Sequence, residues 1–380
     1  MATVHLPDGR DLVLSGQQSW EIPKNPPKNR IAYAAAHVVA DPRAQNAPGA
    51  PAVLDWETTL AFRHHLWSHG LGVAEAMDTA QRGMGLDYAA TRELIRRSAA
   101  EARSAGGRIV AGVATDQLAP GAATLEQVGR AYAEQLSDVL TAGAVPVLMC
   151  SRHLAATARD ADDYLAIYRP LLEKSDKPVV LHWLGTAFDP ALEGYWGSSD
   201  VDKATETLLE LINSNAAKVD GVKVSLLDAD HEIRLRRRLP AGVRLYTGDD
   251  FNYPDLIRGD EQGYSDALLG IFAAIAPAAA AAFAALDRGD LAEYDRIFAP
   301  TVPLSRHIFE KPTFYYKTGI VFLAWLAGHQ RHFTMVGGLQ SGRSVPHFAT
   351  LIELADTAGL LTDPDLAAHR ANRFFEVMAG

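Results

Sequence analysis

The sequence contains one cysteine, Cys150, among its 380 residues. A single cysteine cannot form a disulfide within the chain, which excludes a disulfide framework and is typical of a reducing compartment. We therefore expect a cytoplasmic protein. An excess of basic residues is also missing, because 36 Lys and Arg face 46 Asp and Glu, for a net charge of −10. This balance argues against a nucleic-acid partner.

Membrane segments and targeting signals are equally scarce. Residues 1–10 are too polar for a signal peptide. Residues 267–286 carry no charge, but they are rich in alanine and interrupted by Pro277. We interpret them as a buried strand that ends near Ile271 and a helix after Pro277, and we expect no membrane association.

Short apolar runs alternate with longer helical patterns through most of the chain. Eight runs predict buried strands, at residues 31–39, 71–77, 108–114, 144–150, 178–184, 219–227, 243–246 and 264–271. Eight strands that alternate with helices predict an α/β fold, a (β/α)8 TIM barrel. An open, doubly wound sheet is the alternative, but no glycine-rich dinucleotide fingerprint follows the first strand.

The rhythm of strands stops near residue 290, and helical patterns continue to the end of the chain. We predict an N-terminal arm at residues 1–29, a barrel at 30–289 and a helical C-terminal extension at 290–380.

Lysine is scarce, with nine lysines among the 36 basic residues, and Lys223 has the most unusual surroundings. It lies in the sixth predicted strand between β-branched residues. Strand alternation places Lys223 and Ser225 on one face, and Val222 and Val224 on the other. A buried ammonium tends to lose its proton, and a neutral amine forms Schiff bases with carbonyl compounds. The alternative is a lysine paired with a nearby carboxylate.

Three segments resemble the dihydrodipicolinate synthase and N-acetylneuraminate lyase superfamily: Gly221-Val-Lys-Val-Ser225, Thr247-Gly-Asp-Asp250 and Pro312-Thr-Phe-Tyr-Tyr-Lys317. The resemblance spans roughly residues 30–330. It implies a TIM barrel with a Schiff-base lysine at Lys223, no cofactor or metal, a small carbonyl or carboxylate substrate, and a dimer or tetramer.

The chain departs from this family at several positions. Where the family has a Gly-Thr-Thr-Gly-Glu motif that grips the substrate carboxylate, residues 80–84 read Ala-Gln-Arg-Gly-Met. Gln81 and Arg82 remain candidates for that grip, because arginine binds carboxylates in a bidentate manner. Ala187 stands where the family has a carboxylate-binding arginine.

Histidines occupy places where the family has tyrosines. His182 follows the fifth strand, and His153 follows the fourth, in Cys150-Ser-Arg-His153. Since imidazole titrates near neutral pH, His182 with Ser151 or His153 is expected to shuttle protons.

The prediction is a Schiff-base-forming lyase or aldolase that acts on a 2-oxo acid or a related carbonyl compound. Its predicted catalytic residues are Lys223, His182, His153 and Ser151. Its predicted substrate-binding residues are Gln81, Arg82, Gly83, Ser225, Thr247, Gly248, Asp249 and Asp250.

Two alternatives remain open. The first is a metal-dependent barrel lyase or isomerase, with ligands drawn from strand ends at Asp78, His153, His182, Asp228 and Asp249. The second is a non-catalytic barrel that binds sugar acids.

Overall fold

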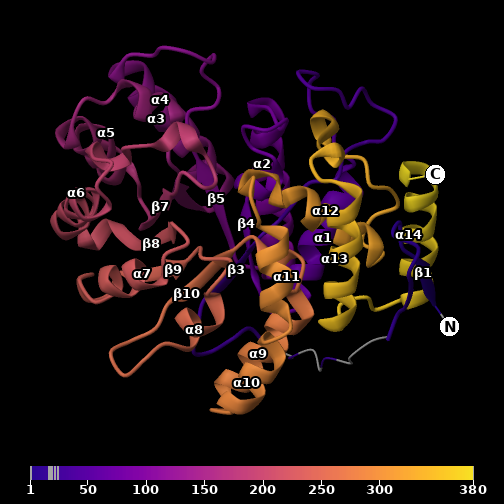
Figure 1. The fold of residues 1–380 in the computed structure, drawn as a ribbon. Helices are drawn as coiled ribbons and strands as arrows, with labels where there is room; N and C mark the ends of the chain where they lie inside the picture. Colours follow the sequence, from indigo (N-terminus) through magenta and orange to yellow (C-terminus); the bar gives the residue numbers. More distant parts are fainter. Residues whose placement is uncertain (1, 16–19, 21–22, 24, 380) are drawn as a thin grey trace.

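A closed barrel of eight parallel strands forms the centre of the molecule (Figure 1). The computed structural model describes residues 2–15, 20, 23 and 25–379. The strands follow chain order around the barrel, and β10 closes it by pairing with β3. They are β3 (Ala32–Ala35), β4 (Gly72–Glu75), β5 (Ile109–Val113), β6 (Val145–Leu148), β7 (Val179–Leu184), β8 (Val219–Ser225), β9 (Arg244–Thr247) and β10 (Asp266–Leu269). The predicted TIM barrel is confirmed. Seven of its strands lie within their predicted runs, and β9 ends one residue beyond its run, at Thr247.

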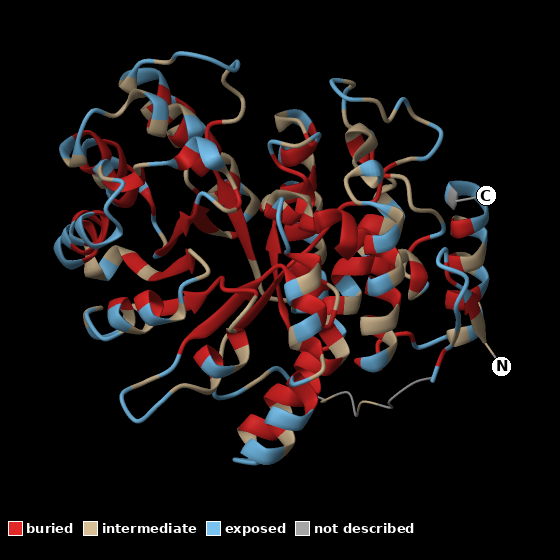
Figure 2. Cartoon of the chain, viewed as in Figure 1, coloured by how far each residue is buried: buried red, intermediate tan, exposed pale blue. Residues whose placement is uncertain are grey.

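An outer layer of helices surrounds the barrel. The helices are α1 (Trp56–Ser68), α2 (Tyr88–Ala105), α3 (Leu125–Ala142), α5 (Ala161–Lys174), α6 (Val201–Ser214), α7 (Ala229–Arg236), α8 (Tyr253–Arg258) and α9 (Ala276–Asp287), with the short α4 (Arg152–Thr157) after β6. Most begin at a side-chain cap, such as Asp55 for α1 and Thr124 for α3. Buried faces turn towards the strands and exposed faces towards solvent (Figure 2).

The C-terminal helices form a second body against the barrel. They are α10 (Leu291–Phe298), α11 (Thr301–Ile308), α12 (Tyr316–Leu326), α13 (Val345–Thr357) and α14 (Pro364–Ala379). Helix α12 is buried along most of its length and contacts the 3-10 turn η1 (Asp78–Ala80) that follows β4. The helical extension is therefore confirmed, and one of its helices reaches the end of a barrel strand.

The N-terminal strands and the C-terminal helix α14 lie side by side (Figure 1). An antiparallel hairpin of β1 (Thr3–His5) and β2 (Asp11–Val13) packs on α14. The amide N–H of His5 donates to Asn372 Oδ1 at 2.7 Å, and Asn372 Nδ2 donates to the Thr3 carbonyl at 2.8 Å. The predicted arm at 1–29 falls partly outside the described residues.

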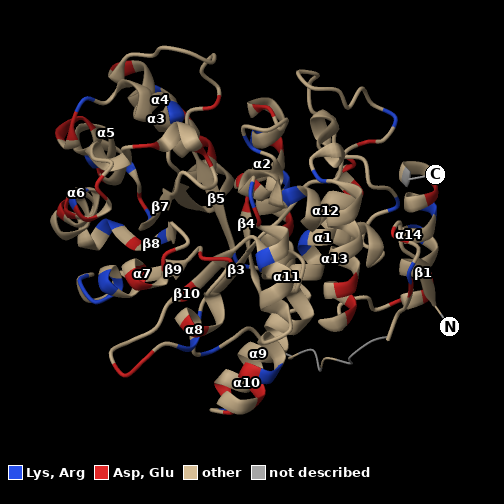
Figure 3. Cartoon of the chain, viewed as in Figure 1, with Lys and Arg blue, Asp and Glu red and all other residues tan. Residues whose placement is uncertain are grey.

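Charge is distributed as the composition suggests. Figure 3 shows acidic and basic residues interspersed along the outer helices and loops, while the strands are mostly uncharged. None of the helices in the described part of the chain is both long enough and apolar enough to cross a membrane.

Alternation along β8 decides where Lys223 points. Val222 and Val224 belong to the apolar core between the strands and the outer helices, whereas Lys223 and Ser225 line a cavity inside the barrel. The lysine therefore faces inward, as the alternation predicts.

Candidate functional site

A small cavity of about 10 Å³ surrounds the end of the Lys223 side chain. It is closed by residues from strand ends, the 3-10 turn after β4 and α12, and the side chain of Lys223 is only 7% exposed. The lining consists of Ala35, Met77, Asp78, Thr79, Leu184, Phe188, Lys223, Ser225, Asp250, Gly270 and Tyr316. The space has the size of a single water molecule, so this part of the site is compact.

Two carboxyl groups determine the electrostatics of Lys223. Burial lowers the pKa of the Lys223 amine, while the charges of Asp78 and Asp250 oppose that shift. Burial raises the pKa of Asp250 to about 7, against a hydrogen bond from the Ile271 amide at 2.9 Å and the charge of Lys223. Burial therefore shifts the pKa values of the Lys223 amine and the Asp250 carboxyl group towards each other, so the two groups can exchange a proton, which a nucleophilic lysine requires.

Tyr316 contributes a hydroxyl to the same cavity. It lies at the start of α12, and its Oη is 2.8 Å from Thr79 Oγ1 in η1. Burial raises the pKa of Tyr316 well above its usual value, and the charge of Asp78 adds to this shift, so the phenol keeps its proton. The sequence analysis identified neither Tyr316 nor Thr79 as a site residue. The only signal was the Pro312–Lys317 segment, whose position over the barrel was not evident from the chain.

Two glycines leave room for these side chains. A Cβ at Gly248 would lie 2.2 Å from Ser225 Oγ and 2.8 Å from Lys223 Cε. A Cβ at Gly270 would lie 3.1 Å from Tyr316 Cε2. The predicted site residue Gly248 thus acts through its missing side chain, which lets Lys223 extend into the cavity.

His182 lies next to Lys223 on the neighbouring strand, where the two residues are paired in register. Its Nε2 is 3.3 Å from Ser225 Oγ, and it is fully buried. Burial, with the charge of Lys223, holds the pKa of His182 well below its usual value, so the imidazole is neutral. His182 reaches the cavity through Ser225, which lines the cavity itself.

A larger cavity of about 790 Å³ opens beside the first, over the ends of β4, β5, β6 and β7. Asp78 and Leu184 line both cavities, so the two are adjacent. Four predicted site residues line the larger one: Arg82, Gly83, Ser151 and His153. The structure thus places Ser151 and His153 beside the lysine cavity rather than within it.

Ser151 and His153 are joined through Thr115. Thr115 Oγ1 lies 2.6 Å from Ser151 Oγ and 3.0 Å from His153 Nδ1. His153 Nε2 lies 3.1 Å from the Ala119 carbonyl, to which it donates. In the neutral imidazole this leaves Nδ1 as an acceptor for the Thr115 hydroxyl, and Thr115 in turn accepts from Ser151. The sequence did not single out Thr115 for this role.

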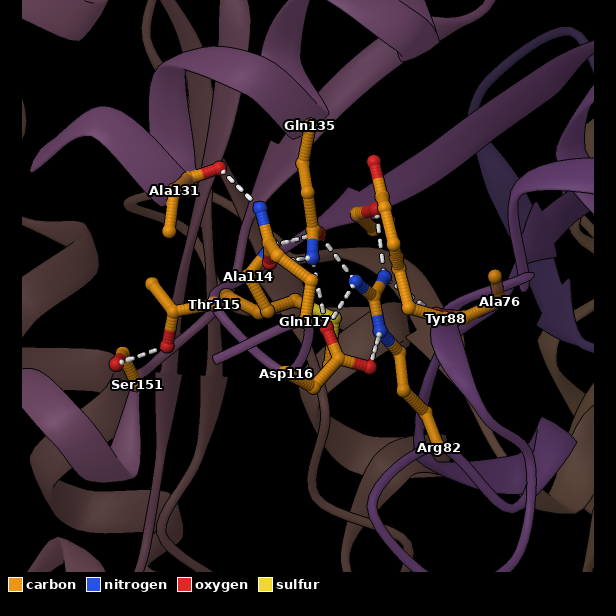
Figure 4. A network of polar contacts seen from close by, with 12 residues as sticks. Ala76, Arg82, Tyr88, Ala114, Thr115, Asp116, Gln117, Ala131, Gln135 and Ser151 are labelled. Atoms are coloured by element: carbon orange, nitrogen blue, oxygen red, sulfur yellow. Dashed lines mark hydrogen bonds and ion pairs between the residues drawn. The ribbon is translucent and has the colours of Figure 1, made fainter. Parts of the chain in front are cut away.

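Arg82 is held by the protein itself (Figure 4). Its Nε and Nη2 bind the two carboxylate oxygens of Asp116 at 2.9 and 2.7 Å, and Nη2 also binds Gln135 Oε1. Its Nη1 donates to the carbonyls of Ala76 and Gly112. All five donors of the guanidinium are engaged, so Arg82 has none left for a substrate carboxylate.

The side chain of the neighbouring Gln81 also forms hydrogen bonds within the protein. Its Nε2 donates to the carbonyls of Val336, at 2.7 Å, and Met84, at 3.2 Å. It therefore ties the loop after β4 to the segment between α12 and α13, and it lines neither cavity.

The two aspartates in the turn after β9 have different surroundings. Asp249 accepts from the amides of Phe251 and Asn252 and shapes the turn, whereas Asp250 lines the lysine cavity. Thr247 donates to Glu232 Oε2 on α7 at 3.0 Å, so its hydroxyl points away from the cavity.

A second buried lysine lies near the site. Lys317 on α12 is 2% exposed, and its Nζ donates to Met84 Sδ at 3.1 Å. Burial lowers its pKa to about 8, against the charge of Asp78. Any test of Lys223 as a nucleophile must therefore distinguish it from Lys317.

The five residues considered as metal ligands do not come together. Asp228 caps α7 by accepting from the His231 amide, while His182 and Asp249 have the partners given above. Within the described ranges, one group of three or more side chains has ligand atoms close enough to share a metal ion: His307, Glu310 and His347, in the C-terminal helices.

Comparison with known proteins places the chain in a family. The model of the family described as "Protein of unknown function (DUF993)" matches residues 6–379, so the chain belongs to this family. No curated protein sequence matches the chain.

Solved structures of similar fold are dihydrodipicolinate synthases and their relatives. The enzyme from Aquifex aeolicus is 11% identical, with a TM-score of 0.68 over 88% of this chain and 99% of that one. A prophage protein of the dihydrodipicolinic acid synthase family from E. coli, in complex with pyruvate, is 15% identical, with a TM-score of 0.67 over 87% and 99%.

The 4-hydroxy-tetrahydrodipicolinate synthase of Methylacidiphilum fumariolicum is 12% identical, with a TM-score of 0.65 over 90% and 99%. These likenesses confirm the predicted resemblance at the level of the fold.

Proposed function

We propose that this member of the DUF993 family is a Schiff-base-forming lyase or aldolase in which Lys223 attacks a carbonyl substrate. The observation that carries the proposal is the inward-facing Lys223 amine, buried beside Asp78 and Asp250 in a small cavity. Burial favours the neutral amine, and the adjacent carboxyl groups accept its proton. The likeness to a pyruvate-bound relative supports the same chemistry.

The proposed reaction begins when the neutral amine of Lys223 adds to the carbonyl carbon and forms a carbinolamine. The proton that leaves the nitrogen passes through Asp250 or Asp78 to the former carbonyl oxygen, which becomes the carbinolamine hydroxyl. Tyr316, hydrogen-bonded to Thr79, donates a proton to the carbinolamine hydroxyl, which leaves as water and yields the iminium. The iminium then accepts the electron pair of the carbon–carbon bond that breaks.

The predicted histidines take supporting roles in this proposal. His182 positions the Ser225 hydroxyl beside the amine. Ser151 and His153, with Thr115, contact the part of the substrate that extends into the larger cavity. Arg82 and Gln81 do not bind the substrate carboxylate in this mechanism, because other groups of the protein already engage both side chains.

Trapping with borohydride tests the proposal directly. The protein is incubated with pyruvate, other 2-oxo acids and aldehydes, reduced, and analysed by intact mass and by peptide mapping. We expect one stable adduct on the peptide that contains Lys223, absent from Lys223→Met. Lys317→Met is the matched control, because it removes the other buried amine, and we expect it to keep the adduct.

An adduct that maps to Lys317, or no adduct with any carbonyl compound tested, would contradict the proposal. Ligand-induced thermal shifts that persist in Lys223→Met, without an adduct in the wild type, would favour the non-catalytic binding barrel instead.

The proposal includes a homo-oligomer, a dimer or tetramer, and a cytoplasmic location. The first rests on the family resemblance and the second on the single cysteine. Light scattering on the purified protein measures the oligomeric state.

A further inference from the structure

The size of the larger cavity constrains the substrate. At about 790 Å³ it falls within the range that accommodates drug-sized ligands, whereas the space at Lys223 is about 10 Å³. A three-carbon carbonyl compound would occupy only a small part of it. Because Asp78 and Leu184 line both cavities, a substrate whose carbonyl reaches Lys223 extends its remaining atoms into the larger one.

The charges of the larger cavity are already paired. Both arginines that line it have a carboxylate partner: Arg82 binds Asp116 at 2.7 Å, and Arg152 binds Asp189 at 2.5 Å. Asp78 adds an acidic group, for whose carboxylate the described part of the chain shows neither an ion pair nor a hydrogen bond. Within the lining, three carboxylates face two arginines, so an anionic substituent would meet excess negative charge, which is costly away from bulk water.

The buried hydroxyl groups that line the cavity can act as acceptors. In the chain from Ser151 through Thr115 to His153, each hydroxyl donates to the next member. Ser151 Oγ also accepts from the Leu154 amide at 3.1 Å. Each hydroxyl oxygen keeps one lone pair for a ligand, and the Asp78 carboxylate is a further acceptor. The rest of the lining is largely small or apolar, including Ala114, Leu118, Met149, Ala156, Leu184 and Leu192.

We infer that the substrate is a carbonyl compound with a bulky, uncharged substituent that carries hydrogen-bond donors such as hydroxyl groups. The carbonyl binds at Lys223, the apolar part of the substituent fills the space between the loops after β5, β6 and β7, and its hydroxyl donates to Ser151, Thr115 or Asp78. This inference rests on the proposed role of Lys223 and adds the class of substrate.

Two aldehydes of similar size separate the charge preference from size. 4-(Hydroxymethyl)benzaldehyde carries a neutral donor, and 4-carboxybenzaldehyde carries an anion at the same position. Reductive trapping on the Lys223 peptide is measured for both, with each rate divided by the rate for n-butylamine to remove intrinsic reactivity. We expect the neutral probe to label Lys223 at least about tenfold faster than the anionic one.

A variant that fills the cavity tests whether the substituent lies there. Ala156 is an exposed residue of α4 that lines the larger cavity but not the small one. Ala156→Phe is expected to slow trapping of 4-(hydroxymethyl)benzaldehyde by a factor at least about tenfold larger than the factor by which it slows trapping of pyruvate. Ala100→Phe, at an exposed position of α2 outside both cavities, is the matched control and keeps both rates.

The outcomes separate the inference from the proposed function. If pyruvate labels Lys223 but the two aldehydes react equally, or Ala156→Phe slows neither probe, the inference is wrong and the lysine chemistry stands. If no probe labels Lys223 in the wild type, both are wrong. Thermal melting of each variant confirms that a lost adduct is not a lost fold.

Discussion

At the scale of the single residue, the hydroxyl of Tyr316 decides how the proposed iminium could form. The phenol is buried beside Lys223 and stays protonated, which suits a proton donor to a departing hydroxyl. In the proposed mechanism a tyrosine from the C-terminal helices therefore has the proton-donor role that we expected of His182 and His153.

Removing that hydroxyl gives the first prediction. Tyr316→Phe keeps the ring and is expected to slow reductive trapping at Lys223 by about 10²-fold, because general acid catalysis typically contributes at least that much. The rate of adduct formation at Lys223 is measured by quenching the trapping reaction at timed intervals, with the carbonyl compound that labels the wild type. Tyr315→Phe, which alters a partly exposed neighbour outside the cavity, is the control and should retain the wild-type rate. Equal rates in the two variants would remove Tyr316 from the mechanism.

The second prediction concerns pH. The charge of Asp250 raises the pKa of Lys223 and so opposes the effect of burial. In Asp250→Asn this opposition is lost, the pKa of Lys223 falls, and the acidic limb of the trapping rate against pH moves to lower pH. Asp255→Asn, at an exposed residue of α8, should leave the profile in place. A shift to higher pH in Asp250→Asn would show that the carboxyl group does not act on the amine.

At the scale of the element, α7 is attached to the barrel through a buried acid. Glu232 accepts hydrogen bonds from Thr247 at the end of β9, at 3.0 Å, and from Ser265 just before β10, at 2.7 Å. Burial raises the pKa of Glu232 to about 8. Helix α7 and two strands that carry the site are therefore connected by a group that keeps its proton at neutral pH.

The stability of the fold should depend on this acid. As pH rises from about 4.5 to 8, the unfolded chain loses a proton that the folded chain retains, so the folded state loses relative stability over this window. We expect the free energy of unfolding of the wild type to fall between pH 5 and 8 by about 2–4 kcal/mol more than that of Glu232→Gln. Urea denaturation at the two pH values measures the difference. Parallel curves for the two proteins would mean that Glu232 ionises normally in the folded state.

At the scale of the whole molecule, the C-terminal helices connect the site to both chain ends. Helix α12 supplies Tyr316 to the lysine cavity, and α14 binds the N-terminal hairpin through Asn372. The contacts at the chain ends involve backbone groups of β1 and a side chain of α14, none of which lines the lysine cavity, so they should affect stability without affecting the chemistry.

Asn372→Ala tests this separation. Loss of its two hydrogen bonds is expected to lower the free energy of unfolding by about 1–2 kcal/mol and to speed amide exchange in β1 and α14. Trapping at Lys223 should not change. Arg373→Ala, on the same helix and with an exposed side chain, is the control for both measurements. A parallel loss of trapping in Asn372→Ala would show that the chain ends and the site are coupled.

The sequence by itself determined the barrel, its helical extension and the inward direction of Lys223. These follow from local patterns, because strand alternation and helical periodicity are set by neighbouring residues. Only the tertiary structure decided the partners of the side chains. Arg82 was a reasonable candidate for a carboxylate grip until folding placed Asp116 and Gln135 against it. Tyr316 and Thr79 line the same cavity as Lys223 only because α12 packs on the turn after β4. Such contacts join segments far apart in the chain, and no local pattern specifies them.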